Sequence, residues 1–326
     1  MYLNHANIGK IMDFNLKPES NSSSFGDQRK IDYNAINNQV EADNTPAILS
    51  LIVDLGVHTP PLNVSDQGSA DFETEEEAND YLAQIIEIKG EKDGAKFKIS
   101  QEGDKFTING NIYQPKDGPA VAIFADLVDN IVDYGGEIGK KPYRIVLNKS
   151  WMGELKGFSL KAVPPQKGSK VWTFAGNSVL TKLAKATKND VIIDGSDAKK
   201  LNNIGLLLGT KIMADVVKNV SGENTYVNIA GVSSIPKALE ATVDTSLVEP
   251  IGISFTNATL ELLEKACLRG NIFKKIKSAN NYKGSNIQKA IEEYEEKHGS
   301  GNQTTESKTD TQVNDGDTTT VEDEDF

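Results

Sequence analysis

Between residues 47 and 235 the chain alternates short apolar segments with turn-forming residues. β-Branched and aromatic residues are common in these segments, and several alternate apolar with polar positions, which is the period of a strand with one buried face. Residues 119–134 fit either helix or strand, and we predict a strand because Gly135 and Gly136 end the segment. We predict seven or eight strands, at residues 47–57, 95–99, 105–113, 119–134, 143–150, 157–163, 210–220 and 224–235.

Helical spacing is confined to fewer places. Residues 177–186 have it, with Asn177 as a plausible N-cap, and a short acidic helix is expected within 66–94. Three more helices are predicted near the C-terminus, at 258–268, 272–277 and 285–298. The fold class is therefore mainly β with some α. An elaborated OB-type β-barrel with C-terminal helices is the simplest architecture that fits, and a β-sandwich is the alternative.

Composition divides the chain into four parts. Residues 1–45 form a polar segment that we expect to be partly ordered, and we expect 46–255 to form a β-rich, OB-like domain. Residues 256–298 form a helical element, and 299–326 form an acidic tail. The tail has almost no apolar side chains, so burial cannot offset the entropy of ordering it, and we expect it to be disordered.

Several function classes find no support in the sequence. One cysteine, Cys267, excludes an internal disulfide, and the three histidines lie far apart, so neither a metal nor a cofactor is expected. Phosphate-loop, nucleophile-elbow and dinucleotide motifs are absent, so we expect no enzyme. Asp215 lies in an apolar strand, where we expect it to face solvent. With no apolar run of membrane length and no signal segment, we expect a cytoplasmic protein.

Charge is strongly segregated along the chain. The formal net charge is −12, and residues 299–326 hold eight acids and one base. Residues 140–188, here called the basic block, hold eleven bases and one acid, Glu154. A positive segment in an otherwise acidic protein indicates an anionic partner.

The basic block also holds both tryptophans. Lysines that follow phosphates, together with aromatic rings that stack on bases, are typical of nonspecific binding to single-stranded nucleic acid. Period-2 alternation places Tyr143 and Phe158 where they can be core residues, so the tryptophans are better stacking candidates. The candidate DNA-binding residues are Lys140, Lys141, Tyr143, Arg144, Lys149, Trp151, Lys156, Phe158, Lys161, Lys167, Lys170, Trp172 and Phe174.

The last residues form the most specific local motif. Four carboxylates precede a terminal aromatic ring, in Glu322, Asp323, Glu324, Asp325 and Phe326. A polar linker, an acidic cluster and a final Phe resemble the C-terminus of bacteriophage single-stranded DNA-binding proteins of the T7 type. Bacterial counterparts usually have Pro before this Phe, and this chain does not. The segments KPYRIVLNKSWMGELKGFSL and LGTKIMADVVKNVSGENTYVNIAGV also resemble phage replication-associated OB-fold proteins.

The resemblance implies a sequence-nonspecific protein that binds single-stranded DNA in phage DNA replication, recombination or repair, in the cytoplasm of an infected bacterium. It further implies that the tail competes with DNA and recruits replication and repair enzymes. Two alternatives remain open. One is a virion structural or interaction protein with a solubilising tail, and the other is an annealing or recombination mediator. The sequence leaves the oligomeric state open.

Overall fold

The computed structural model describes residues 31–135, 138–148, 150–151, 154–160, 178–188 and 204–298, without the side chains of residues 150, 151 and 154. The chain forms two compact units. The large unit combines Met1–Gly56 with Pro119–Phe326, and the small unit is Val57–Gly118. The small unit is thus an insertion inside the region that the sequence indicated as one β-rich domain.

The large unit contains a seven-stranded sheet. Its hydrogen-bonded order is β11–β7–β1–β12–β13; β8 also pairs with β7, and β14 runs parallel to β1. The described strands form no closed barrel, although β13 approaches β8. The strands are β1 (Asn44–His58), β7 (Gly118–Asp133), β8 (Lys140–Val146), β11 (Phe158–Ser159), β12 (Lys211–Ser221), β13 (Asn224–Ser234) and β14 (Ile251–Ile253).

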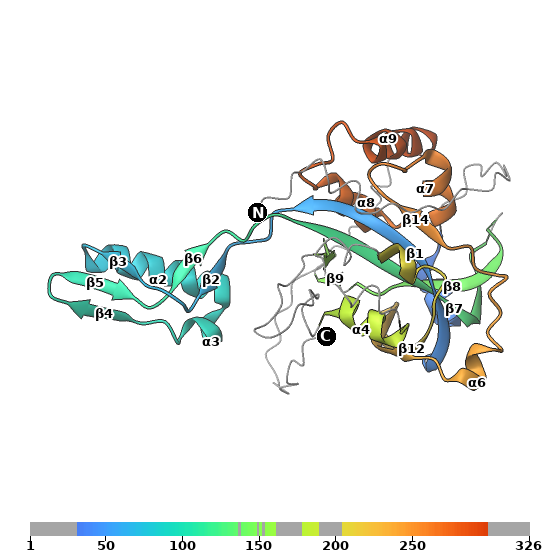
Figure 1. Ribbon diagram of the computed structural model, residues 1–326, viewed down its shortest axis with the longest axis horizontal. Coiled ribbons are helices and arrows are strands. Elements are labelled where there is room, and N and C mark those ends of the chain that lie inside the picture. The colour runs from blue at the N-terminus through green and yellow to red at the C-terminus, as the bar shows by residue number, and fades with distance from the viewer. Residues whose placement is uncertain are drawn as a thin grey trace. The chain divides into compact units, whose positions relative to one another are not determined.

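Strands β1 and β7 are long and buried on both faces, which explains their nearly continuous apolar sequences. On one face, residues such as Leu49 and Ile123 join an inner core with β8, β12 and α4 (Val179–Ala186). On the other face, residues such as Val53 and Phe124 join an outer core with the C-terminal helices. Each fully buried apolar side chain contributes about 1.5–3 kcal/mol. These helices, grouped on one side of β1 in Figure 1, are α7 (Leu260–Ala266), α8 (Gly270–Lys277) and α9 (Asn286–His298).

Helix α1 (Tyr33–Gln39) links two strands that do not pair with each other. The Asn37 side chain accepts a hydrogen bond from the Tyr143 hydroxyl on β8 at 2.8 Å. It also donates to the Thr225 carbonyl on β13 at 2.7 Å. α1 therefore bridges β8 and β13 at the place where a barrel would close. No pattern within residues 33–39 predicted this helix.

The small unit has its own core, in which α2 packs on short strands (Figure 1). Thr74 and Glu77 form a capping box at the start of α2, and three consecutive glutamates make up the first turn of this helix. Strands β3, β5 and β4 make one sheet, and β2 and β6 make another. The elements are β2 (Asn63–Ser65), β3 (Ala70–Phe72), α2 (Glu75–Lys89), α3 (Glu91–Gly94), β4 (Ile99–Glu102), β5 (Lys105–Ile108) and β6 (Asn111–Tyr113).

Several sequence predictions are confirmed. The coarse class, mainly β with helices, is correct, as are the β12–β13 hairpin and the three C-terminal helices. The hairpin predicted at 95–99 and 105–113 forms with other bounds, because β4 is Ile99–Glu102, β5 ends at Ile108, and the following β6 pairs with β2. Residues 119–134 do form a strand, with a register shift between Leu127 and Ile131. Asp215 is exposed, as expected. One detail was wrong, because Ser178 rather than Asn177 caps α4.

The remaining described elements are short. β9 and β10, which follow β8 in the chain, form a separate two-stranded sheet. No helix in the described part of the chain is long and apolar enough to cross a membrane. These elements are β9 (Ser150–Trp151), β10 (Glu154–Leu155), the 3-10 helix η3 (Ile204–Leu207) and α6 (Lys237–Glu240).

Candidate nucleic-acid interface

The described structure covers part of the predicted interface. Seven of the block's eleven bases are described: Lys140, Lys141, Arg144, Lys156, Lys182, Lys185 and Lys188. Trp151 lies in β9, and its side chain is not described. The predicted residues outside the described ranges are Lys149, Lys161, Lys167, Lys170, Trp172, Phe174, Glu322, Asp323, Glu324, Asp325 and Phe326.

Two of the predicted aromatic residues belong to the core rather than to an open surface. Tyr143 is only 1% exposed, and its hydroxyl is bonded to Asn37. Phe158 is half-buried and packs against the inner core. Both side chains therefore pack in the protein core, and period-2 alternation had already marked both as possible core residues. In this fold the Tyr143 ring cannot stack on a base.

Arg144 is likewise occupied within the fold. Its guanidinium makes two hydrogen bonds to the Asp126 carboxylate, at 2.7 and 3.0 Å, and a third to the Ala266 carbonyl at 3.2 Å. Asp126 also accepts a hydrogen bond from the Ser50 hydroxyl at 2.7 Å. The charge of Arg144 is therefore compensated locally, and the side chain links the sheet to the end of α7.

The exposed lysines of the basic block do not form one compact patch. Lys141, the second residue of β8, lies opposite Val132 near one end of β7. Lys156 precedes β11, which pairs near the other end of β7 at Val121. Eleven residues of extended strand separate these two positions on β7, which is about 36 Å. The basic charge therefore extends along the sheet.

Helix α4 and the residues directly after it carry three lysines of the basic block, Lys182, Lys185 and Lys188. Ser178 caps its first turn by accepting a hydrogen bond from the backbone N–H of Thr181. Leu180 and Leu183 face the inner core, and this fixes which side of the helix faces outward. Lys185 is exposed on that side and Lys188 follows the helix, also exposed. In the described part of the chain, neither lysine forms an ion pair. α4 also lies against β13.

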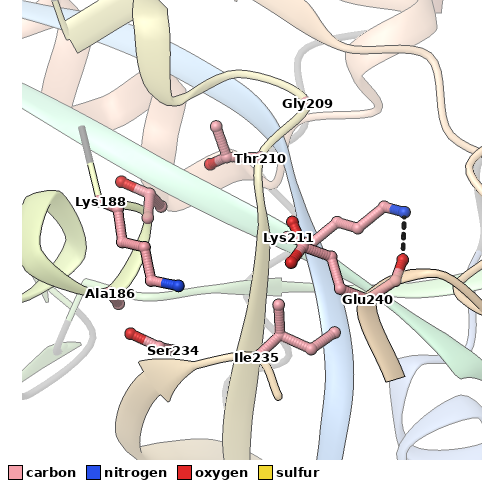
Figure 2. A pocket seen from close by; sticks show the side chains of 9 residues that line it. Ala186, Lys188, Gly209, Thr210, Lys211, Ser234, Ile235 and Glu240 are labelled. Carbon is pink, nitrogen blue, oxygen red and sulfur yellow. Dashed lines mark hydrogen bonds between the residues drawn. The ribbon is translucent and has the colours of Figure 1, made fainter. Parts of the chain in front are cut away.

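A polar pocket of about 230 Å³ lies at the end of α4 (Figure 2). Lys211 donates hydrogen bonds from Nζ to the carbonyls of Glu240, at 2.7 Å, and Val243, at 3.4 Å. Figure 2 shows the Lys188 side chain on the α4 side and Glu240 on the opposite side. The lining residues are Ala186, Thr187, Lys188, Gly209, Thr210, Lys211, Ser234, Ile235 and Glu240.

The pocket chemistry suits a polar ligand with an anionic group. Two ammonium groups, on Lys188 and Lys211, outnumber the one carboxylate, on Glu240, and three hydroxyls, on Thr187, Thr210 and Ser234, supply donors and acceptors. Lys211 lies outside the basic block, and counting charge along the sequence missed it. Only the folded contact between the α4 end and the start of β12 reveals it. Among the described residues, no group of three or more His, Cys, Asp or Glu side chains could hold a metal ion.

Comparison with known proteins identifies no relative. No family model matches the chain, and neither a curated protein nor a solved structure matches it. Function must therefore be argued from the residues and their geometry.

Proposed function

We propose that this chain is a sequence-nonspecific single-stranded DNA-binding protein that acts in phage DNA replication, recombination or repair. The observation that carries the proposal is the outward face of α4, where Lys185 and Lys188 are exposed next to the pocket that contains Lys211. Lysines contact the phosphates of any sequence, which suits a protein that coats single strands.

The strand order supports an OB-type assignment. If β1, β7, β8, β12 and β13 are numbered one to five, their order across the sheet is three, two, one, four, five. Strand five approaches strand three, and α4 lies between strands three and four in the chain. A partly open OB barrel has this order and a helix in this place. In this scheme the small unit replaces the loop between strands one and two.

The proposal places DNA away from the surface that OB folds commonly use. That surface is the outer face of strands two and three, which here are β7 and β8. On this face Phe124 and Val146 belong to the outer core, and Arg144 binds the Ala266 carbonyl. The C-terminal helices cover it, so the α4 side is the better surface for DNA.

Lysine substitutions on α4 test the proposal directly. In the full-length chain, Lys185→Gln with Lys188→Gln should weaken binding of fluorescent oligo-dT and make the log–log salt slope shallower by about 1.4, or 0.7 for each lost phosphate contact. Fluorescence anisotropy between 50 and 300 mM salt measures both quantities. Lys92→Gln with Lys98→Gln, at exposed sites in the small unit, is the charge-matched control. If both double variants bind alike, α4 does not contact the DNA.

The acidic tail enters the proposal as a competitor of DNA and as a docking segment for partner enzymes. Residues 299–326 hold eight acids and one base, and tethering raises their effective concentration near the lysines. Deleting 299–326 should therefore tighten oligo-dT binding, most strongly at low salt, where screening is weakest. Equal affinity of the truncated and full-length chains at 50 mM salt would contradict this part of the proposal.

A further inference from the structure

Arg269, in the turn between α7 and α8, has an unusual set of partners. Its guanidinium carbon lies 4.2 Å from the centre of the Tyr33 ring. The phenol groups of Tyr33 and Tyr143 both lie close enough to this guanidinium for its charge to affect their pKa values. Arg269 itself is half-buried, so part of the side chain still reaches solvent. A guanidinium has five N–H donors, so two neighbouring hydroxyls leave donors for another group.

Among the described residues, no carboxylate pairs with Arg269 to compensate its charge. Burial raises the pKa of Tyr33 and of Tyr143, so both phenols stay neutral near pH 7. No described ion pair includes Arg269, whereas Arg144 nearby is paired with Asp126. A partly buried cation without a carboxylate is costly unless an anion joins it. The planar guanidinium is suited to binding the oxygens of a phosphate.

The position of Arg269 relates it to the proposed DNA surface. Tyr143 lies on β8, two residues after the exposed Lys141. Tyr33 begins α1, whose Asn34 accepts a hydrogen bond from the Thr225 backbone at the start of β13. The pocket with Lys188 includes Ser234, at the other end of β13. Nine residues of strand separate Thr225 and Ser234, which is about 30 Å.

We infer that Arg269 binds a phosphate group of the single strand, and that the strand follows β13 from Arg269 to the pocket at Lys188. This inference rests on the proposed function. It adds a contact 81 residues beyond the basic block and gives the bound strand a path. About 30 Å of path matches the site of a few nucleotides that a single OB fold occupies.

Arg269→Met tests the contact, because Met keeps apolar bulk beside Tyr33 and removes the charge. In the full-length chain we expect about tenfold weaker oligo-dT binding at 100 mM salt and a log–log slope shallower by about 0.7. Lys265→Met, in the last turn of α7, removes a nearby cation that is already paired with Glu249 and Glu261, and it is the control. Unchanged affinity and slope in a folded Arg269→Met variant would overturn the inference.

A second variant covers the case in which Arg269→Met does not fold, as judged by circular dichroism. Arg269→Lys keeps the charge and loses the planar fork, so we expect severalfold weaker binding with an unchanged salt slope. Arg269→Gln removes the charge and keeps side-chain N–H donors, and binding and salt slope equal to the wild type in folded Arg269→Gln would overturn the inference.

Inorganic pyrophosphate separates failure of the inference from failure of the proposed function. If the wild-type chain does not bind oligo-dT, the proposed function fails. Arg269 then remains an anion site only if millimolar pyrophosphate raises the melting temperature of the wild type and not of Arg269→Met. The absence of that difference would overturn the anion site as well. If the wild type binds oligo-dT and Arg269→Met binds equally well, only the inference fails.

Discussion

Asp54 is a buried carboxylate near the end of β1, and its replacement by Asn should change how stability depends on pH. The residue is 4% exposed, and its Oδ1 accepts a hydrogen bond from the Gly56 backbone at 2.8 Å. Burial raises the pKa of Asp54 from 3.8 to about 6, although hydrogen bonds from the backbone N–H groups of Gly56 and Phe255 oppose the shift. No described ion pair compensates the charge.

The sign and size of the effect follow from this shift. Between pH 3.8 and about 6 the folded chain binds more protons at Asp54 than the unfolded chain does, so the free energy of unfolding falls as pH rises. A shift of about two units corresponds to about 3 kcal/mol. This contribution to stability is present below pH 3.8 and is lost by the time pH passes 6. In Asp54→Asn it is absent at every pH.

Urea unfolding of the wild type and Asp54→Asn, followed by circular dichroism at several pH values, measures the difference. Two compact units can unfold separately, so hydrogen exchange of the β1 amides gives a local reading. Relative to the wild type, the variant should gain about 2 kcal/mol between pH 4 and pH 7, because part of the shift lies below pH 4. Asp215→Asn, an exposed site on β12, controls for the loss of one carboxylate. A difference between wild type and Asp54→Asn that stays constant across this range would refute the reasoning.

Three other substitutions test packing in the large unit. Gly56→Ala should lower stability by about 1–3 kcal/mol, because φ is +88° and an added Cβ would lie 2.5 Å from the Ala279 side chain; thermal unfolding measures this loss. Asn37→Ala removes the two hydrogen bonds that link β8 and β13 through α1, and the free energy of unfolding in urea should fall by about 1–3 kcal/mol. An unchanged free energy of unfolding would show that these two bonds do not stabilise the fold. Asp126→Ala leaves the Arg144 charge uncompensated and should lower the free energy of unfolding by about 3 kcal/mol. Asp126→Ala combined with Arg144→Met should lower it by less, and a double-mutant cycle measures the difference.

Local patterns predicted the parts of the fold that depend on local interactions. The β12–β13 hairpin forms around Ser221 and Gly222, where turn-forming residues separate two apolar runs. The C-terminal helices follow from their own apolar periodicity. Charge counting along the chain likewise located the lysines of α4. In each case the signal lies within about fifteen consecutive residues, the range over which periodicity operates.

The rest depends on contacts between distant residues, and local patterns do not encode these. Arg144 was a predicted DNA contact, and its role in the fold depends on Asp126 in another strand. Helix α1 forms against backbone groups of β13, almost 190 residues away in sequence. Arg269 lies beyond the basic block and meets Tyr33 only in the folded chain. We predicted one β-rich domain because the strands of the small unit alternate apolar and polar residues with the same two-residue period as the strands of the large unit.

Titration of the full-length wild-type chain with fluorescent oligo-dT at 50 and 200 mM salt tests the central claim most directly. With about four phosphate contacts, the account predicts binding at 50 mM that weakens about 50-fold at 200 mM, with little preference among single-stranded sequences. No binding at micromolar protein and 50 mM salt, or an affinity that does not change with salt, would contradict it.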